Sequence, residues 1–169
     1  MPHLNPPEGT LLMIAEQAHF RPVTRSDFDF LWALNREVYK AHVDAIWGWN
    51  ETEQKQSFTE AFLQSDTDRR VIEIAGWAVG ELELEHRADV LFVANVKIKP
   101  EMQSRGIGRE IFGHLKSVAT MRNATIELLV FRTNFRAMSF YRQQGFEEVG
   151  QTGTHRRFRW ALAPKVDVI

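Results

Sequence analysis

Two periodicities of apolar and polar residues divide this chain into helices and strands. Apolar residues recur at helical spacing in segments that begin after Ser26 and after Asn50, and again at 106–122 and 134–144. Alternating or continuous apolar runs predict strands at 11–22, 70–75, 77–86, 90–99, 125–131, 146–149 and 155–162. The resulting order, β-α-α-β-β-β-α-β-α-β-β, predicts an α/β fold with one mixed central sheet flanked by helices.

The first two helices carry recognisable start signals. Ser26 is the expected N-cap of the first helix, with Asp29 three residues later. Asn50 is the expected N-cap of the second, with Glu53 as its capping partner. The buried stripe of the second helix should consist of Phe58, Ala61 and Phe62.

The strand at 77–86 alternates strictly between leucine and glutamate near its end. Leu82 and Leu84 should face the core, whereas Glu81, Glu83 and Glu85 should face outward. A solvated sheet face is the favoured interpretation for these three glutamates.

The next strand, 90–99, is apolar on both faces in its first half, as a central strand should be. In its second half Val96 and Ile98 share one face, and Asn95 and Lys97 share the other. Pro100 ends the strand.

Length and composition bound the class of protein. A chain of 169 residues is sufficient for one domain, so 1–169 is expected to fold as a unit, with a loose leader at 1–9 and a short tail at 164–169. Hydrophobic residues at 44% and charged residues at 25% are typical of a globular protein. The net charge of -1 argues against a nucleic-acid or anionic-membrane partner, so any anion site must be local.

Cysteine is absent, which excludes disulfides, zinc–thiolate sites and a cysteine nucleophile. The histidines show no metal-ligand spacing, so no metal is expected. The N-terminus lacks a basic start, and its apolar run at 11–15 is too short for a signal or spanning segment. The expected location is cytoplasmic.

The segment QSRGIGRE, 103–110, raises the question of a phosphate site. Glycines that open a helix allow close backbone approach to an anion at the positive end of the helix dipole. A P-loop is excluded because Gly108 is followed by Arg109, and a dinucleotide fingerprint is excluded because position 111 is Ile111. On this segment alone, a plain turn and a phosphate site stay equally open.

Two motifs together resemble the GCN5-related N-acetyltransferase (GNAT) family. Its signature Gln/Arg-x-x-Gly-x-Gly/Ala is matched by Gln103, Gly106 and Gly108. Its second signature, Asn-x-x-Ala-x-x-x-Tyr followed by Gly-Phe, is matched by Asn134, Ala137, Tyr141, Gly145 and Phe146. The resemblance is clear over 90–150, and the expected element order agrees with the family fold.

The resemblance implies a site for acetyl-coenzyme A as co-substrate. The pyrophosphate would lie on the loop formed by Gln103, Ser104, Arg105, Gly106, Ile107, Gly108 and Arg109. The pantetheine arm would pair with the backbone of Val96, Lys97 and Ile98, and Asn134 and Tyr141 would also touch the cofactor. Ser104 departs from the glycine that many relatives have there, which restricts the backbone at the first turn.

The implied reaction is direct transfer of an acetyl group to a primary amine. A tyrosine with a pKa near ~10 is protonated at neutral pH, so Tyr141 is the expected acid for the leaving thiolate. Packing in the core is the alternative role for Tyr141. If one of the strand glutamates is the base, Glu83, in the middle of the row, is the choice.

Trp47 and Trp49 flank a glycine between the first two helices, in the region that borders the acceptor site in this family. They are assigned either to the acceptor site, by stacking or cation–π contact, or to wedging the helices onto the sheet.

Other functions on the same sequence stay open. One is a non-catalytic coenzyme A-binding sensor or regulatory module, and another is an interaction domain whose loop binds nothing. The acceptor would be a small-molecule or peptide amine, and a homodimer is compatible with the sequence.

Overall fold

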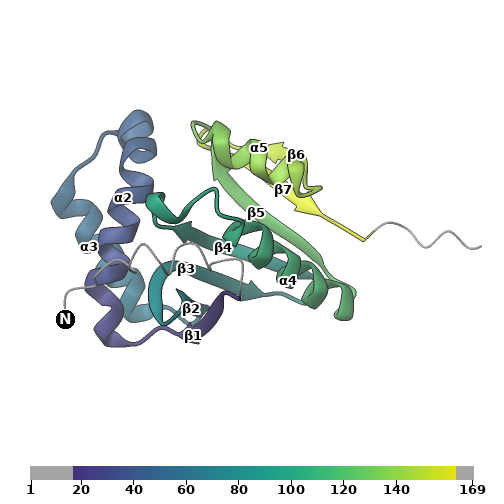
Figure 1. The fold of residues 1–169 in the computed structure, drawn as a ribbon. Coiled ribbons are helices and arrows are strands. Elements are labelled where there is room, and N and C mark those ends of the chain that lie inside the picture. Colours follow the sequence, from purple (N-terminus) through teal and green to yellow (C-terminus); the bar gives the residue numbers. More distant parts are fainter. Residues whose placement is uncertain (1–16, 163–169) are drawn as a thin grey trace, which may run out of the picture.

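The computed structural model describes residues 17–162 (Figure 1). The expected leader at 1–9, the first part of the expected strand at 11–22 and the expected tail at 164–169 lie outside these residues. The order of the elements confirms the α/β fold with a mixed sheet flanked by helices.

The helices and strands follow the predicted segments closely. The strands are β1 (His19–Pro22), β2 (Asp68–Ile74), β3 (Trp77–His86), β4 (Val90–Ile98), β5 (Thr125–Phe131), β6 (Glu147–Gln151) and β7 (His155–Trp160). The α-helices are α2 (Phe28–Trp47), α3 (Glu51–Gln64), α4 (Ile107–Met121) and α5 (Phe135–Gln143). Short 3₁₀ turns, η1 (Arg25–Asp27) and η2 (Pro100–Met102), precede α2 and the loop before α4.

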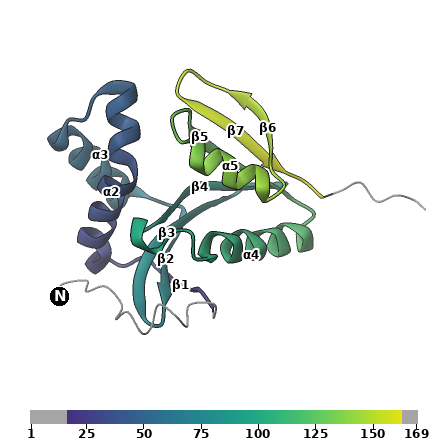
Figure 2. The ribbon, with the colours of Figure 1, turned by 45° about the horizontal axis from the view of Figure 1, so that its top comes forward.

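One sheet of seven strands, in the order β1-β2-β3-β4-β5-β7-β6, organises the molecule (Figures 1 and 2). The α4 and α5 side chains pack in one core, and those of α2 and α3 pack in another. Because successive strand residues point to opposite faces, Ile72 joins the first core and its neighbour Val71 joins the second. The two helix pairs therefore cover opposite faces of the sheet.

The parallel pair β4–β5 separates partway along its length. Val90–Val93 pair with Thr125–Leu128, but the rest of β4, as far as Ile98, pairs only with β3. Figure 1 shows the two strands diverging toward the α2 side. The second half of β4 therefore turns an unpaired edge of backbone N–H and C=O groups toward the gap.

The start of α2 corrects one prediction. The N-cap of α2 is not Ser26 but Asp27, and Ser26 lies within η1, whose own N-cap is Thr24. The backbone N–H and the hydroxyl of Thr24 both donate to Asp27 Oδ2, at 2.7 and 2.9 Å. Ser26 is not a cap because Thr24 and the buried Asp27, three residues later, form the capping box of η1, whereas Asp29 is already within α2.

The side chain of Asp27 also closes α2 onto the sheet, because Arg21 of β1 donates to both of its oxygens at 2.9 and 2.7 Å. Burial alone would raise the pKa of this carboxyl, which is only 4% exposed, but the hydrogen bonds from Arg21 and Thr24 lower it to about 2. The ionised form is therefore strongly favoured in the folded state.

We expect Asp27→Asn to lower the free energy of unfolding by about 2 kcal/mol at neutral pH. The folded pKa lies below the unfolded one, so this stability is present above about pH 4 and is lost as the pH falls toward 2. Urea unfolding of both proteins at pH 7 and at about pH 3 measures this, and the difference should shrink at the lower pH. An equal difference at both would mean that Asp27 acts without its charge.

Helix α3 is correctly placed but less buried than predicted. Asn50 is its N-cap, and its side chain accepts the N–H groups of Thr52 and Glu53. Phe58 and Phe62 are half-buried, but Ala61 is exposed, because α3 packs against α2 at the edge of the structure. No helix within residues 17–162 has the length and apolarity to cross a bilayer.

Candidate active site

A cavity of about 770 Å³ occupies the gap between β4 and β5. Its walls come from both strands, from the loop before α4, and from α2, α4 and α5. Most of the residues assigned to the cofactor from the sequence line it, namely Val96, Lys97, Ile98, Gln103, Ser104, Gly106, Ile107, Gly108, Arg109, Asn134 and Tyr141. Arg105, Glu83, Trp47 and Trp49 are not among the lining residues.

The loop before α4 is fixed to the end of β4. The side-chain amide of Gln103 donates to the carbonyl of Ile98 at 2.9 Å. Gly106 takes a left-handed φ of 86° as the N-cap of α4, and a Cβ added there would meet no protein atom within 4 Å. The first N–H groups of α4 have no partner within the helix, so they are available to an anion.

Ser104 adopts a φ of 60°, the region that glycine occupies without strain. Its hydroxyl accepts a hydrogen bond from Arg136 Nη2 at 2.7 Å. Arg136 also lines the cavity, but it was not predicted to do so, although it lies inside the Asn134–Tyr141 motif. Arg105 instead donates to the carbonyl of Glu101 at 3.0 Å. The cation that contacts the loop at Ser104 is therefore Arg136 of α5.

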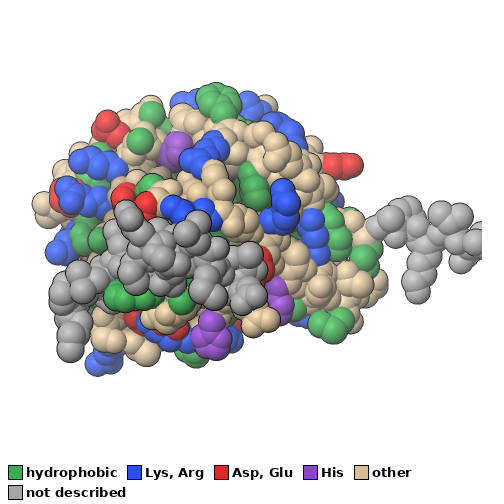
Figure 3. Space-filling view, viewed as in Figure 1, with side chains coloured by type: hydrophobic (Ala, Val, Ile, Leu, Met, Phe, Trp, Pro, Cys, Tyr) green, Lys and Arg blue, Asp and Glu red, His purple; other side chains and the backbone are tan. Residues whose placement is uncertain are grey.

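The surface near this loop is basic. In the space-filling view, Lys and Arg side chains gather over the part of the surface that α4 and α5 form (Figure 3). Arg109 and Arg136 bring two of these charges to the cavity itself. This end of the cavity therefore suits a negatively charged ligand.

The two faces of the second half of β4 differ, as predicted. Val96 and Ile98 pack with the α4–α5 core. On the other face, Asn95 Oδ1 accepts a hydrogen bond from Tyr39 Oη of α2 at 3.1 Å, and Lys97 Nζ lies 4.9 Å from the centre of the Tyr39 ring. The cavity thus reaches both sides of the sheet.

Glu81 overturns the prediction of a solvated glutamate face, because it is 0% exposed. Lys97 Nζ donates to its Oε2 at 2.9 Å, and Arg69 Nε donates to its Oε1 at 3.0 Å. Burial alone would raise the pKa of the Glu81 carboxyl. The charges and hydrogen bonds of Lys97 and Arg69 outweigh this effect, so the pKa lies below its usual value. Glutamate and leucine do alternate between the two faces of β3, but helix α2 covers the glutamate face.

Glu83 does not line the cavity but lies behind the side chain of Asn95. Its Oε1 accepts from Thr67 Oγ1 at 2.6 Å, and its Oε2 accepts from Asn95 Nδ2, also at 2.6 Å. Asn95 lines the cavity, so it separates the Glu83 carboxylate from that space. Glu85, the third of the row, is paired with Arg87 at 2.8 Å.

Tyr141 is held by helix α5 at the gap. Asn134 caps this helix by accepting the Ala137 N–H at 3.1 Å. The Tyr141 ring packs edge-to-face on Phe112 at 5.3 Å and lies 5.7 Å from Phe146. Burial raises the pKa of the Tyr141 hydroxyl, so it is a proton donor rather than an anion at neutral pH.

The two tryptophans have different surroundings. Trp49 stacks on Trp32 at 6.3 Å and donates its indole N–H to Glu51 at 2.7 Å, so it wedges α2 against the start of α3. Trp47 is 59% exposed and lies 6.2 Å from Phe131, a residue of the cavity wall.

Comparison with known proteins gives a family match. The model of the acetyltransferase (GNAT) domain matches residues 61–148, which include β4, the loop and α5. No curated protein matches the sequence.

Several solved structures share the fold. One is the PaiA N-acetyltransferase from Thermoplasma acidophilum in complex with coenzyme A, with 18% identity, coverage of 87% of this chain and 100% of that chain, and a TM-score of 0.67. The spermidine N-acetyltransferase from Vibrio cholerae, in complex with CoA and spermine, has 22% identity, coverage of 85% and 95%, and a TM-score of 0.62. The ribosomal-protein-S18-alanine N-acetyltransferase from Escherichia coli has 16% identity, coverage of 89% and 98%, and a TM-score of 0.63. At these identities the likeness concerns the fold.

Proposed function

Because the chain belongs to the GNAT family of acetyltransferases, we propose that it transfers the acetyl group of acetyl-coenzyme A directly to a primary amine. The observation that carries the proposal is the cavity at the β4–β5 gap. It brings together the loop before α4, an unpaired strand edge and a buried tyrosine, which are the parts that this transfer requires.

The cofactor would occupy the cavity from the loop inward. Its pyrophosphate would accept hydrogen bonds from the backbone N–H groups at 106–109, with Arg109 and Arg136 supplying charge. The pantetheine arm would pair with the free edge of β4 at 94–98 in the manner of an added strand. Asn134, whose Oδ1 already caps α5, would contact the arm from the opposite wall.

The chemical step needs an oxyanion donor and a proton donor. The neutral amine attacks the thioester carbonyl, and a backbone N–H of β4 within 96–98 would stabilise the resulting oxyanion. The C–S bond then breaks, and Tyr141 would give its proton to the departing thiolate. The chain contains no cysteine, which agrees with transfer without a thioester intermediate on the protein.

The amine must also lose a proton. Glu83 does not reach the cavity directly, so in this proposal it accepts the proton through one water beside Asn95. Its two hydrogen bonds, from Thr67 and Asn95, hold the carboxylate in place for that role.

We expect Glu83→Gln to lower kcat by roughly 10²-fold, because the amide keeps the shape of the side chain but cannot take up the proton. Glu85→Gln is the matched control, since Glu85 lies in the same row but pairs with Arg87. Steady-state thiol release measures both variants. An unchanged kcat in Glu83→Gln would remove Glu83 from the mechanism and leave the surrounding water as the base.

The proposed function is tested by two measurements on the wild-type protein. Calorimetry with coenzyme A should show binding, and thiol release should rise when a mixed library of primary amines is added to acetyl-coenzyme A. Binding without release for any amine would indicate the sensor or regulatory module instead. Absence of binding would mean that the loop is an ordinary turn.

A further inference from the structure

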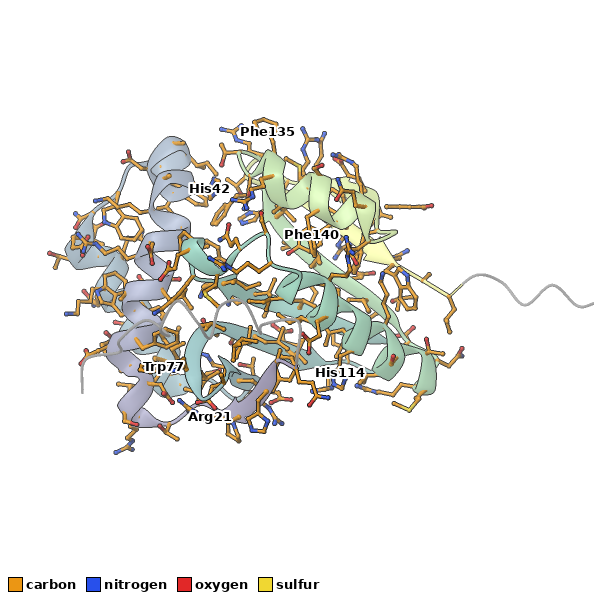
Figure 4. All side chains as sticks on the ribbon, viewed as in Figure 1. Arg21, His42, Trp77, His114, Phe135 and Phe140 are labelled. Carbon is orange, nitrogen blue, oxygen red and sulfur yellow. The ribbon has the colours of Figure 1, made fainter. Side chains whose placement is uncertain are left out.

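Five aromatic and imidazole rings join α2 to strands β5 and β7, and we refer to them as the aromatic cluster. Phe131 of β5 is at its centre, with ring centroids 5.2 Å from Tyr39, 5.8 Å from His42 and 6.2 Å from Trp47, all of α2. His155 of β7 lies 4.6 Å from Phe131. In Figure 4, His42 projects from α2 toward the part of the molecule formed by α5 and β7.

The aromatic cluster forms the end of the cavity opposite the loop before α4. Tyr39, Phe131 and His155 line the cavity from the α2 side, whereas Arg109 and Arg136 line it from the side of α4 and α5. An acetyl-coenzyme A molecule anchored at the loop would present its thioester at the β4–β5 gap. The space beyond the gap, against the aromatic cluster, is then left for the acceptor.

This end of the cavity carries little charge. The residues that line the cavity include no Asp or Glu. Burial lowers the pKa of both His42 and His155 below 6.5, so both rings are neutral at pH 7. The nearest charges are already engaged, since Lys97 pairs with Glu81, and Glu83 is held by Thr67 and Asn95.

A polyamine would fit this end poorly. Each additional ammonium would leave water without meeting a carboxylate, and burying an unpaired charge is costly. An aromatic body, in contrast, would gain both apolar burial and stacking or edge-to-face contacts with the rings. Trp47, exposed over 59% of its surface, offers a further ring beside Phe131 and His155.

We propose that the acceptor is a small arylalkylamine, a primary amine on a short chain from an aromatic ring, and that its ring packs against Phe131 and His155 in the cavity wall. The proposal rests on the proposed function and specifies the substrate class of the same cavity. The amino group would extend from the aromatic cluster toward the β4–β5 gap, where the thioester lies.

The test compares phenethylamine, butylamine and spermidine as acceptors in steady-state thiol release with wild-type protein. We expect kcat/KM for phenethylamine to exceed that for each of the others at least tenfold. Phe131→Ala should remove this preference, mainly through a higher KM for phenethylamine, and should change the value for butylamine little. Phe135→Ala is the matched control, because Phe135 is 74% exposed at the start of α5 and should leave all three values unchanged.

Phe131→Leu covers the case in which the alanine variant does not fold, since leucine keeps an apolar side chain but removes the ring. Phe131→Leu should lower kcat/KM for phenethylamine alone, by about threefold to tenfold. The proposal would be overturned by a wild-type protein whose kcat/KM is highest for spermidine. It would also be overturned by a Phe131 variant in which kcat/KM falls equally for butylamine and phenethylamine.

A binding measurement separates this inference from the proposed function. Saturation-transfer NMR of phenethylamine with the coenzyme A complex reports ring contact without turnover. One outcome is that no amine releases thiol, but phenethylamine binds and Phe131→Leu weakens this binding. The transfer function would then be wrong, and the arylalkylamine site would stand. If phenethylamine neither binds nor reacts, the arylalkylamine site is wrong even where another amine is acetylated.

Discussion

Replacing Tyr141 with phenylalanine is expected to lower kcat by roughly 10²–10⁴-fold, the usual loss when a general acid is removed. The ring packs against Phe112 and Phe146 on the buried side of α5, so its removal would disturb the core. Phenylalanine keeps those contacts and loses only the hydroxyl. Coenzyme A affinity should change little, because the loop and the edge of β4 supply most of the cofactor contacts in our proposal.

The pH dependence of kcat should reflect the burial of this tyrosine. Burial raises the pKa of Tyr141, so its hydroxyl stays protonated at pH values where an exposed tyrosine would ionise. The wild-type kcat should therefore hold its value at alkaline pH, instead of falling near the ordinary tyrosine pKa of ~10. Thiol-release rates from about pH 7 to pH 10.5 measure this, with circular dichroism as the check on the fold.

Tyr39→Phe is the matched control, because Tyr39 is the other of the 2 tyrosines in the chain and also lines the cavity. Its hydroxyl already donates to Asn95 at 3.1 Å, so it is not the proposed donor to the thiolate. The loss in kcat should be less than about tenfold, in line with one lost neutral hydrogen bond. If Tyr141→Phe costs no more than Tyr39→Phe, Tyr141 is a packing residue.

Much of the fold could be predicted because local signals agreed with the tertiary structure. The stripe of α4 that includes Ile111, Phe112 and Leu115 is buried as its helical spacing requires. Asn50 and Asn134 cap their helices because their short side chains reach the first free N–H groups. Such signals depend on neighbouring residues only, so a single sequence contains them.

The errors arose where a distant element decides the outcome. Glu81 alternates with leucine as a surface residue would, but α2 covers it, and Arg69 and Lys97 from the neighbouring strands compensate its charge. Asp27 replaces Ser26 as the N-cap of α2, because Arg21 of β1 and the capping box with Thr24 fix Asp27. Neither partner can be identified from spacing along the chain.

The candidate site divides in the same way. The glycine loop and Tyr141 lie in motifs and could be assigned from the sequence. The aromatic cluster could not, because Tyr39, Phe131 and His155 are far apart in the sequence and belong to three different elements. Arg136 lies in a motif, but only the contact with Ser104 reveals that it faces the loop.

Gly106→Val is expected to weaken coenzyme A binding by about 10²–10⁴-fold, which corresponds to losing two charge-assisted hydrogen bonds. Gly106 has a φ of 86°, a conformation that a β-branched residue adopts only with strain. An added Cβ meets no protein atom within 4 Å, so the new side chain would occupy the space in front of the α4 N–H groups, where the proposed pyrophosphate lies. Calorimetry with coenzyme A measures the loss.

Gly76→Val separates the two causes of this effect. Gly76 has a φ of 79° in the turn between β2 and β3, and an added Cβ there also meets no protein atom within 4 Å. Both variants should lower the melting temperature, because both force valine into the left-handed region. Only Gly106→Val should raise the dissociation constant of coenzyme A, since Gly76 does not line the cavity. A Gly106→Val protein that loses stability like Gly76→Val but keeps its coenzyme A affinity would show that the glycine serves the turn into α4 and not a phosphate.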